Sequence, residues 1–177
     1  YNDPANVFVA GFIGSPAMNF FSAEVRDGRI ALPFAEIAAP EGVPDGDVIA
    51  GIRPEDFEDA ELAPQHHPGG VPFEAPIEVL ESMGSEIYAY FSLEGGEVSS
   101  DELAELARDS GMADTPGGAQ DGSRAVARLN PESQVREGET AKLWVDGAKV
   151  HLFSHEDGRN LAGEGASAQP NNGQVTD

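Results

Sequence analysis

Four histidines in this sequence could be considered as ligands of a metal ion. His66 and His67 are adjacent, and the other two are His151 and His155. Metal ions are held by imidazole nitrogens that converge on one point. Two neighbouring histidines in a loop rich in proline and glycine cannot easily aim at one ion, so we predict that this chain has no metal site.

The acidic pairs Glu55-Asp56 and Glu58-Asp59 could suggest calcium binding. They lack the ligand spacing of an EF-hand loop, and a solvated acidic surface accounts for them. The chain has no cysteine, which excludes a thiolate nucleophile and a cysteine-based zinc site. It also has no G-x-x-x-x-G-K-[ST] loop, which nucleotide hydrolases use to hold phosphates. We predict no catalytic residue and no cofactor in this segment.

The charge of the chain is strongly negative. Ten basic residues stand against 32 acidic ones, and the formal net charge is -22. Nucleic-acid binding depends largely on Lys and Arg, so we predict that no nucleic acid is a partner. Abundant acid with only two lysines, Lys142 and Lys149, favours a salt-loving source; the alternative is a GC-rich genome that enriches Asp, Glu and Arg.

Thirteen prolines and 21 glycines divide the chain into short pieces, which favours a mainly β protein. Strands are expected at 19–25, 29–32, 48–52, 73–79, 87–93, 125–129, 141–145 and 149–153. The pair Asp27-Gly28 predicts a hairpin turn, and Asp146-Gly147 predicts a second one. The alternating runs at 73–79 and 87–93 are expected to pair with each other.

Two short helices are expected outside this β core. Residues 4–13 have apolar positions at near-helical spacing after Asp3-Pro4, and residues 101–108 follow a capping-box pattern. Pro64 to Pro72 is expected to be a surface connection because it is rich in Gly and Pro. Residues 94–122 read as an insertion, and the polar composition from residue 154 to 177 predicts a flexible tail.

Four segments resemble segments of one protein family, and they occur in the same order as in that family. They are YNDPANVFVAGFIGSPAMNF at the start, GIRPEDF from Gly51 to Phe57, VLESMGSEIYAYF from Val79 to Phe91, and REG, LWVD and VHLF between Arg136 and Phe153. They resemble the C-terminal regulatory region of the ATP-binding subunits of carbohydrate and glycerol-3-phosphate ABC importers. The insertion at 94–122 has no counterpart that we can place in that family.

The resemblance implies OB-like small barrels of the kind called transport-associated OB domains. It implies a connector at 1–15 from a nucleotide-binding domain that is missing here and a regulatory domain at 16–153. ATP and Mg²⁺ would belong to the missing domain. The implied partners are a second copy in a homodimer, the transmembrane permease subunits and regulatory proteins. The implied location is the cytoplasmic face of the cell membrane.

Within this resemblance, strand alternation puts Val150 and Leu152 on one face and His151 and Phe153 on the other. We expect an exposed Phe153 ring, beside His151, to anchor the dimer. Trp144 lies on the face opposite its neighbours and is expected either to meet a partner or to be covered by the insertion.

The structural motif residues are Gly51, Arg53, Pro54, Glu55 and Gly84, and we expect the Arg53 guanidinium to clamp a carboxylate or loop carbonyls. Two other functions stay open from the sequence. One is a sensor for small anions, which the negative charge disfavours. The other is a free-standing acidic interaction module.

Overall fold

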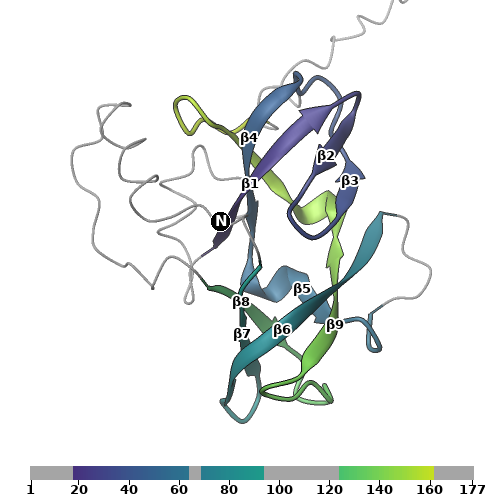
Figure 1. Cartoon of the computed structure of the whole chain (residues 1–177), viewed down its shortest axis with the longest axis vertical. Helices are drawn as coiled ribbons and strands as arrows, with labels where there is room; N and C mark the ends of the chain where they lie inside the picture. Colours follow the sequence, from purple (N-terminus) through teal and green to yellow (C-terminus); the bar gives the residue numbers. More distant parts are fainter. Residues whose placement is uncertain (1–17, 64–68, 94–123, 162–177) are drawn as a thin grey trace, which may run out of the picture.

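The computed structural model describes residues 18–63, 69–93 and 124–161 (Figure 1). These residues form strands joined by short turns. The strands are β1 (Asn19–Arg26), β2 (Arg29–Ala31), β3 (Glu36–Ala38), β4 (Gly46–Ile52), β5 (Phe57–Asp59), β6 (Gly70–Ser82), β7 (Ile87–Phe91), β8 (Ala125–Leu129), β9 (Thr140–Asp146) and β10 (His151–Ser154). Two 3-10 turns, η1 (Pro54–Asp56) and η2 (Gly147–Lys149), connect them.

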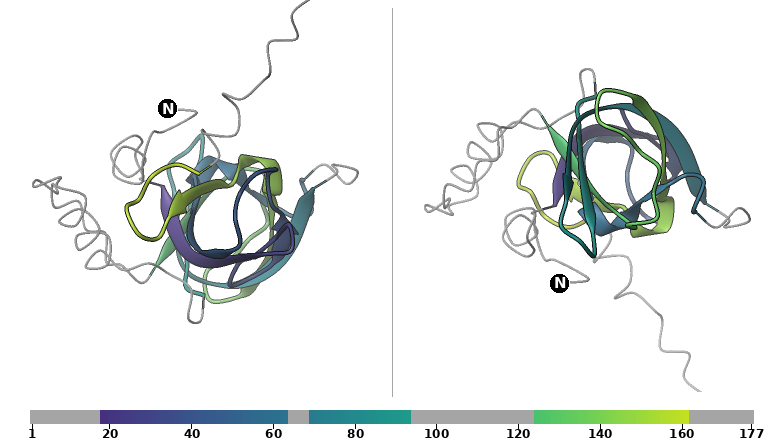
Figure 2. Two further views of the ribbon diagram at one scale, coloured as in Figure 1. Left: turned by 90° about the horizontal axis from the view of Figure 1, so that it is seen from above. Right: turned by 90° about the horizontal axis from the view of Figure 1, so that it is seen from below.

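The strands make two five-stranded antiparallel sheets. The first has the order β10-β4-β1-β2-β3 and the second the order β5-β9-β6-β7-β8. Seen from above and from below, the strands curl around a common centre (Figure 2). The chain is therefore mainly β with an OB-like barrel, as the sequence predicted.

The core between the sheets is rich in aromatic side chains. Phe21 comes from β1, Phe34 from the loop after β2, and Phe57, Phe73 and Phe91 from the second sheet. The contacting rings have centroids 4.3 to 6.5 Å apart, in tilted and edge-to-face arrangements that aromatic pairs favour. This cluster joins the two sheets into one hydrophobic core.

The first predicted hairpin is confirmed. β1 and β2 pair in antiparallel register, with Val25 opposite Ile30. The turn residues Asp27 and Gly28 have φ values of 51° and 75°, the two positive angles that a type I′ turn requires. Asp is one of the few residues that adopt this backbone conformation readily, so the Asp-Gly pair specifies the turn.

The predicted pairing of the two alternating runs is also confirmed, since β6 pairs with β7. β6 begins at Gly70, inside the expected surface connection. Its Pro72 and Pro76 lack amide hydrogens, yet the Ile77 amide donates to the Glu139 carbonyl on the β9 side. Pro72 and Pro76 lie an odd number of positions from Ile77, so their nitrogens face the side of β6 opposite to β9. The ladder between β6 and β9 therefore loses no hydrogen bond to them.

The predicted hairpin at Asp146-Gly147 is wrong. β9 pairs with β5 and β6 in the second sheet, whereas β10 pairs with β4 in the first. The Asp146 carboxylate accepts a hydrogen bond from the Ala148 amide at 3.0 Å and thereby caps η2. The chain therefore crosses between the sheets at this point, and Leu152 of β10 fills the shared core.

The predicted start of the tail at residue 154 does not match the structure. β10 includes Ser154, whose amide donates to the Arg159 carbonyl at 2.7 Å. The Leu161 amide donates a hydrogen bond to the Leu152 carbonyl, and Asn160 is buried. The polar composition of residues 154–161 did not indicate the compact turn that their backbone hydrogen bonds form. The described fold therefore continues to Leu161.

The predicted helices at 4–13 and 101–108 lie outside the described residues, as does the whole insertion at 94–122. In the part of the chain that the structure describes, no helix is long and apolar enough to cross a membrane.

Candidate functional site

The motif from Gly51 to Phe57 occupies the place where the chain passes from the first sheet to the second. β4 ends at Ile52, η1 follows, and β5 begins at Phe57. Arg53 is only 4% exposed, and its carbonyl accepts the Asp56 amide at 3.0 Å. Pro54 is the buried first residue of η1, a position where the missing amide hydrogen costs nothing. The motif therefore forms a tight crossing between sheets, and the burial of Arg53 favours a structural role.

A residue that the sequence analysis missed, Asn19, ties the same junction together. Its side-chain amide donates to the Ile52 carbonyl at 3.1 Å and to the Val126 carbonyl at 2.9 Å. Its Oδ1 accepts the Val126 amide at 2.8 Å. Asn19 thus pairs with the backbone of β8 much as a strand residue would and links the two sheets. The sequence did contain one signal for this role, because Asn19 is a polar residue in phase with the core-facing apolar positions of its strand.

Gly51 permits a close approach on the outward side of β4. A Cβ atom added there would lie 2.5 Å from the Met18 sulfur and 2.9 Å from Cε2 of Phe153. Separations below about 3.0 Å do not occur between real atoms of this kind. Glycine at this position is therefore needed for the packing of the two side chains. Gly84, another residue of the predicted motif, has a φ of 82° in the turn between β6 and β7.

The orientation predicted for Phe153 holds, but its predicted exposure does not. Leu152 belongs to the core cluster, and Phe153 points to the opposite face. Phe153 is nevertheless fully buried, with its ring 6.1 Å from that of Phe20 and 6.5 Å from that of His151. It packs within the fold, so the exposed ring that suggested a dimer anchor is absent.

Trp144 is half-buried on the outward side of β9. Its indole covers Gly70, where any Cβ atom would collide with the ring. Trp144 belongs to β9 in the second sheet, whereas His151 and Phe153 are close to each other on β10 in the first sheet. His66 and His67 fall outside the described residues, and His155 is exposed after β10.

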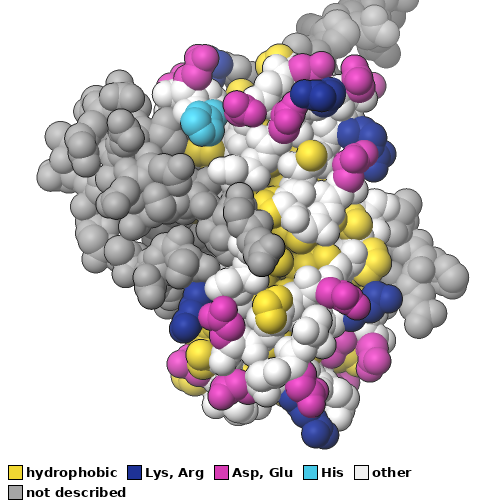
Figure 3. Space-filling model, in the orientation of Figure 1, with side chains coloured by type: hydrophobic (Ala, Val, Ile, Leu, Met, Phe, Trp, Pro, Cys, Tyr) yellow, Lys and Arg dark blue, Asp and Glu magenta, His cyan; other side chains and the backbone are white. Residues whose placement is uncertain are grey.

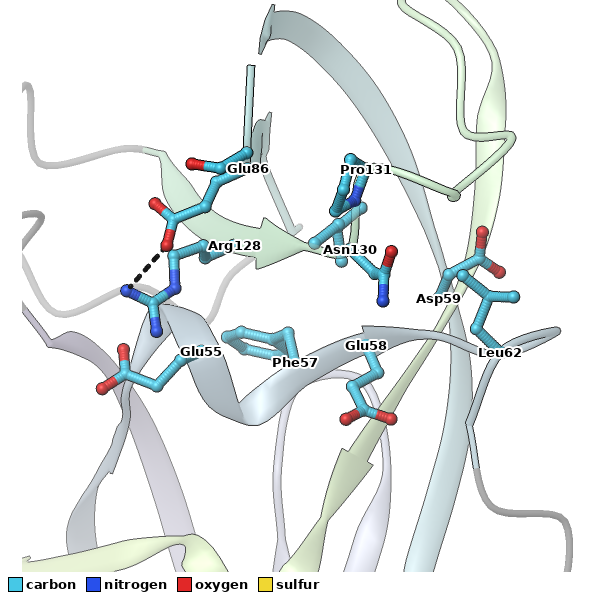
Figure 4. A pocket seen from close by; sticks show the side chains of 11 residues that line it. Glu55, Phe57, Glu58, Asp59, Leu62, Glu86, Arg128, Asn130 and Pro131 are labelled. Carbon is cyan, nitrogen blue, oxygen red and sulfur yellow. Dashed lines mark ion pairs between the residues drawn. The ribbon is translucent and has the colours of Figure 1, made fainter. Parts of the chain in front are cut away.

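A pocket of about 330 Å³ lies beside the crossing motif. Its lining residues come from three separate parts of the chain, namely residues 55–62, 85–86 and 128–131. Figure 4 shows Arg128 and Glu86 at one end of the pocket and Asp59 with Leu62 at the other. Asp59 is 6% exposed, and its carboxylate accepts hydrogen bonds from the Ser133 hydroxyl at 2.6 Å and the Glu61 amide at 3.0 Å.

The pocket has an acidic lining. Glu55, Glu58, Asp59 and Glu86 contribute carboxylates, whereas Arg128 is the basic residue among the lining side chains and lies 3.5 Å from Glu86. Acidic side chains also occupy both ends of the face in Figure 3, with basic ones among them. Such a pocket repels anions and attracts cations.

Asp56, which lies in the sequence between the lining residues Glu55 and Phe57, has its Oδ1 3.8 Å from the Lys149 ammonium. Burial raises the pKa of Asp56 above its usual value of 3.8, and the Lys149 charge partly offsets that rise. None of the described residues forms a cluster of three or more His, Asp or Glu that could hold a metal ion.

The fold and this junction define an OB-type β domain. Residues 14–57 match the family model described as the MalK OB fold domain. The chain is 40% identical over 171 residues to the trehalose import ATP-binding protein SugC of Mycobacterium tuberculosis. It is 32% identical over 164 residues to the sn-glycerol-3-phosphate import ATP-binding protein UgpC of Paracoccus denitrificans. It is also 32% identical over 171 residues to the trehalose/maltose import ATP-binding protein MalK of Thermococcus litoralis.

These similarities cover nearly all of this chain and a smaller part of each relative. The alignments include 91%, 92% and 91% of this chain but 42%, 37% and 38% of the respective relatives. The chain is therefore similar to a region of sugar and glycerol-3-phosphate import ATP-binding proteins that carries an OB domain.

Proposed function

We propose that this chain is the C-terminal regulatory and dimerisation region of the ATP-binding subunit of an ABC importer for carbohydrates or glycerol 3-phosphate. The observation that carries this proposal is the 40% identity to a trehalose import ATP-binding protein along 91% of the chain. The OB-like barrel and the match of residues 14–57 to the MalK OB domain support it. The substrate class comes from the relatives, because the sequence itself does not identify a sugar.

In this proposal, catalysis belongs to a nucleotide-binding domain that precedes residue 1 in the parent protein. That domain would bind ATP and Mg²⁺ and hydrolyse the ATP. This segment has no phosphate-binding G-x-x-x-x-G-K-[ST] loop. Its own role would be to hold two subunits together while the catalytic domains close and reopen.

The proposed partners are a second copy of the subunit, the transmembrane permease subunits and, on the barrel surface, regulatory proteins. The complex would lie on the cytoplasmic face of the membrane. Phe153 is buried in the described fold, so a dimer contact through this residue would need the covering atoms to move. The half-buried Trp144 and His151 stay as predicted contact residues.

The two alternative functions are less well supported. A small-anion sensor needs a site that attracts negative charge, whereas the pocket beside the crossing motif carries four carboxylates and one guanidinium. A free-standing acidic module does not account for the extended similarity to import ATP-binding proteins.

The experiment is to read the gene upstream of the codon for Tyr1 and to assay the encoded parent protein. We expect Walker A, signature and Walker B motifs upstream, and ATP hydrolysis by the parent. Calorimetry should detect no ATP binding to the 177-residue segment alone. Deletion of residues 18–161 from the parent should weaken its dimer in sedimentation. An upstream sequence without these motifs, or ATP binding by the segment, would refute the proposal.

A further inference from the structure

The pocket beside the crossing motif lies between the two edge strands of the second sheet. These strands are β5 and β8, and both contribute to the lining. Phe57, Glu58 and Asp59 come from β5, whereas Arg128 and Leu129 come from β8. In the described strands, ladder pairing does not continue from β5 to β8. The surface at this seam of the barrel is therefore formed by side chains that are free to meet a partner.

The charges of this pocket are balanced at one end and not at the other. At the first end, the Arg128 guanidinium lies 3.5 Å from one oxygen of Glu86, and the other oxygen accepts the Tyr88 hydroxyl at 2.9 Å. Asp59 lies at the opposite end (Figure 4), where no Lys or Arg is among the described lining residues. Glu58, next to Asp59 in β5, is exposed, and its side chain makes no ion pair with another described residue. Glu58 therefore adds a negative charge that the described fold does not neutralise.

Exposed apolar side chains belong to the same segments that line the pocket. Leu62 is a lining residue and is 46% exposed. Met83 is 64% exposed and lies in the turn between β6 and β7, which also carries the lining residues Ser85 and Glu86. These two are the exposed large hydrophobic residues of the described part of the chain. Exposed apolar side chains next to polar ones are typical of surfaces that bind another protein.

We propose that this surface binds an arginine side chain, flanked by apolar residues, of a regulatory partner protein. We call it the pocket surface, and it consists of Glu58, Leu62, Met83, Glu86 and Arg128. The net negative charge of the pocket and of the whole chain attracts a basic segment and orients its approach.

A guanidinium suits the end that carries Glu58, because its planar donors can bond two oxygens at once. The apolar residues beside it would contact Leu62 and Met83. The inference rests on the proposed function in one respect, the existence of a regulatory partner. Its test needs only the 177-residue chain, so its failure is distinguishable from an upstream sequence without Walker motifs.

The test is a titration of the nitrogen-15-labelled full chain with a short peptide, followed by amide chemical shifts. The probe is acetyl-Leu-Arg-Leu-amide, which has one guanidinium between two apolar side chains. The matched control peptide has citrulline in place of arginine, which keeps the shape of the side chain and removes its charge. We expect shift changes at amides of residues 55–62, 83–86 and 128–131, and several-fold weaker binding of the citrulline peptide.

Variants of the chain separate the pocket surface from general attraction to an acidic protein. Glu58→Gln removes one charge from the pocket surface, and Leu62→Ser removes its exposed apolar side chain. Glu74→Gln is the matched control, because it removes the same charge from an exposed position of β6 that does not line the pocket. We expect Glu58→Gln and Leu62→Ser each to weaken binding of the arginine peptide several-fold, and Glu74→Gln to leave it unchanged.

Four results would overturn the proposal. Equal weakening by Glu58→Gln and Glu74→Gln would show attraction to the net charge alone. Equal binding of the two peptides would show that the surface does not recognise a cation. Shift changes confined to other residues, or no binding, would show that this surface is not the site. Self-association of the chain in sedimentation that Glu58→Gln abolishes would assign the surface to a second copy in place of a basic partner.

Discussion

Removal of the Asn19 amide is the sharpest test of how the two sheets are joined. Asn19 makes three hydrogen bonds to the backbone, two to Val126 and one to Ile52, and is 8% exposed. A hydrogen bond of this kind contributes about 1 kcal/mol net, so Asn19→Ala should cost about 3 kcal/mol. Domains of this size have a stability of about 5–15 kcal/mol, so the variant should still fold.

Urea unfolding, followed by far-UV circular dichroism at fixed salt, measures this loss. With a denaturant slope of about 1–3 kcal/mol per M, the midpoint should fall by about 1–3 M. Ser22→Ala is the matched control, because Ser22 is an exposed residue of the same strand and should change stability by no more than about 0.5 kcal/mol. Equal midpoints for Asn19→Ala and the control would refute the bridging role of the amide.

Asn19→Asp separates hydrogen bonding from shape. The carboxyl group can still accept the Val126 amide, but its second oxygen would face the Ile52 and Val126 carbonyls. Burial there raises the pKa of the introduced carboxyl, so the variant should be more stable at low pH and lose stability as the pH rises through that pKa. A stability difference from the parent chain that does not vary with pH would contradict this reading.

Three other outcomes test separate features of the fold. Gly51→Ala should destabilise it by about 1–3 kcal/mol, because a Cβ atom would displace Met18 and Phe153, and an unchanged melting temperature would show that these side chains move apart freely. Because burial raises the pKa of Asp56 above 3.8, ionisation of this carboxyl opposes folding once the pH exceeds 3.8. The stability of Asp56→Asn should therefore rise relative to the parent as the pH increases above 3.8, and parallel pH curves for the two proteins would contradict this. Added salt should raise the melting temperature of a chain with net charge -22, since the Debye length falls from about 10 Å at 0.1 M to about 3 Å at 1 M, and a constant or falling value would disprove the effect of self-repulsion.

The parts of the fold that the sequence predicted well rest on local signals. Asp27-Gly28 specifies its hairpin because few residue pairs accept two positive φ values in succession. The runs that became β6 and β7 alternate clearly and lie next to each other in the chain. The strands β3 and β5 were missed, because three residues are too few to show an alternating pattern and, unlike the equally short β2, neither follows an Asp-Gly turn.

The parts that failed depend on contacts between distant residues. Asp146-Gly147 has the sequence of a hairpin turn. The crossing between the sheets at this point depends instead on distant contacts, namely the pairing of β9 with β6 and the burial of Leu152 in the core. The alternation of side chains along β10 correctly predicted the face of the sheet on which Phe153 lies, but it did not predict that this side chain is buried. The lining of the pocket could not be inferred, because residues 55–62, 85–86 and 128–131 have no spacing that marks them as neighbours.

The pairing of β10 with β4 has a consequence for the order in which this domain can fold. Residue 151 lies opposite residue 51, so the first sheet is completed by a strand about 100 positions later in the chain. Such non-local pairings slow folding, because the entropy of closing the intervening loop is lost before the contact forms. During synthesis, β4 keeps an unpaired edge of Ile49, Ala50 and Gly51 until the last strand leaves the ribosome. A nascent or truncated chain that ends before His151 would expose this apolar edge, the kind of template on which other chains add strands and aggregate.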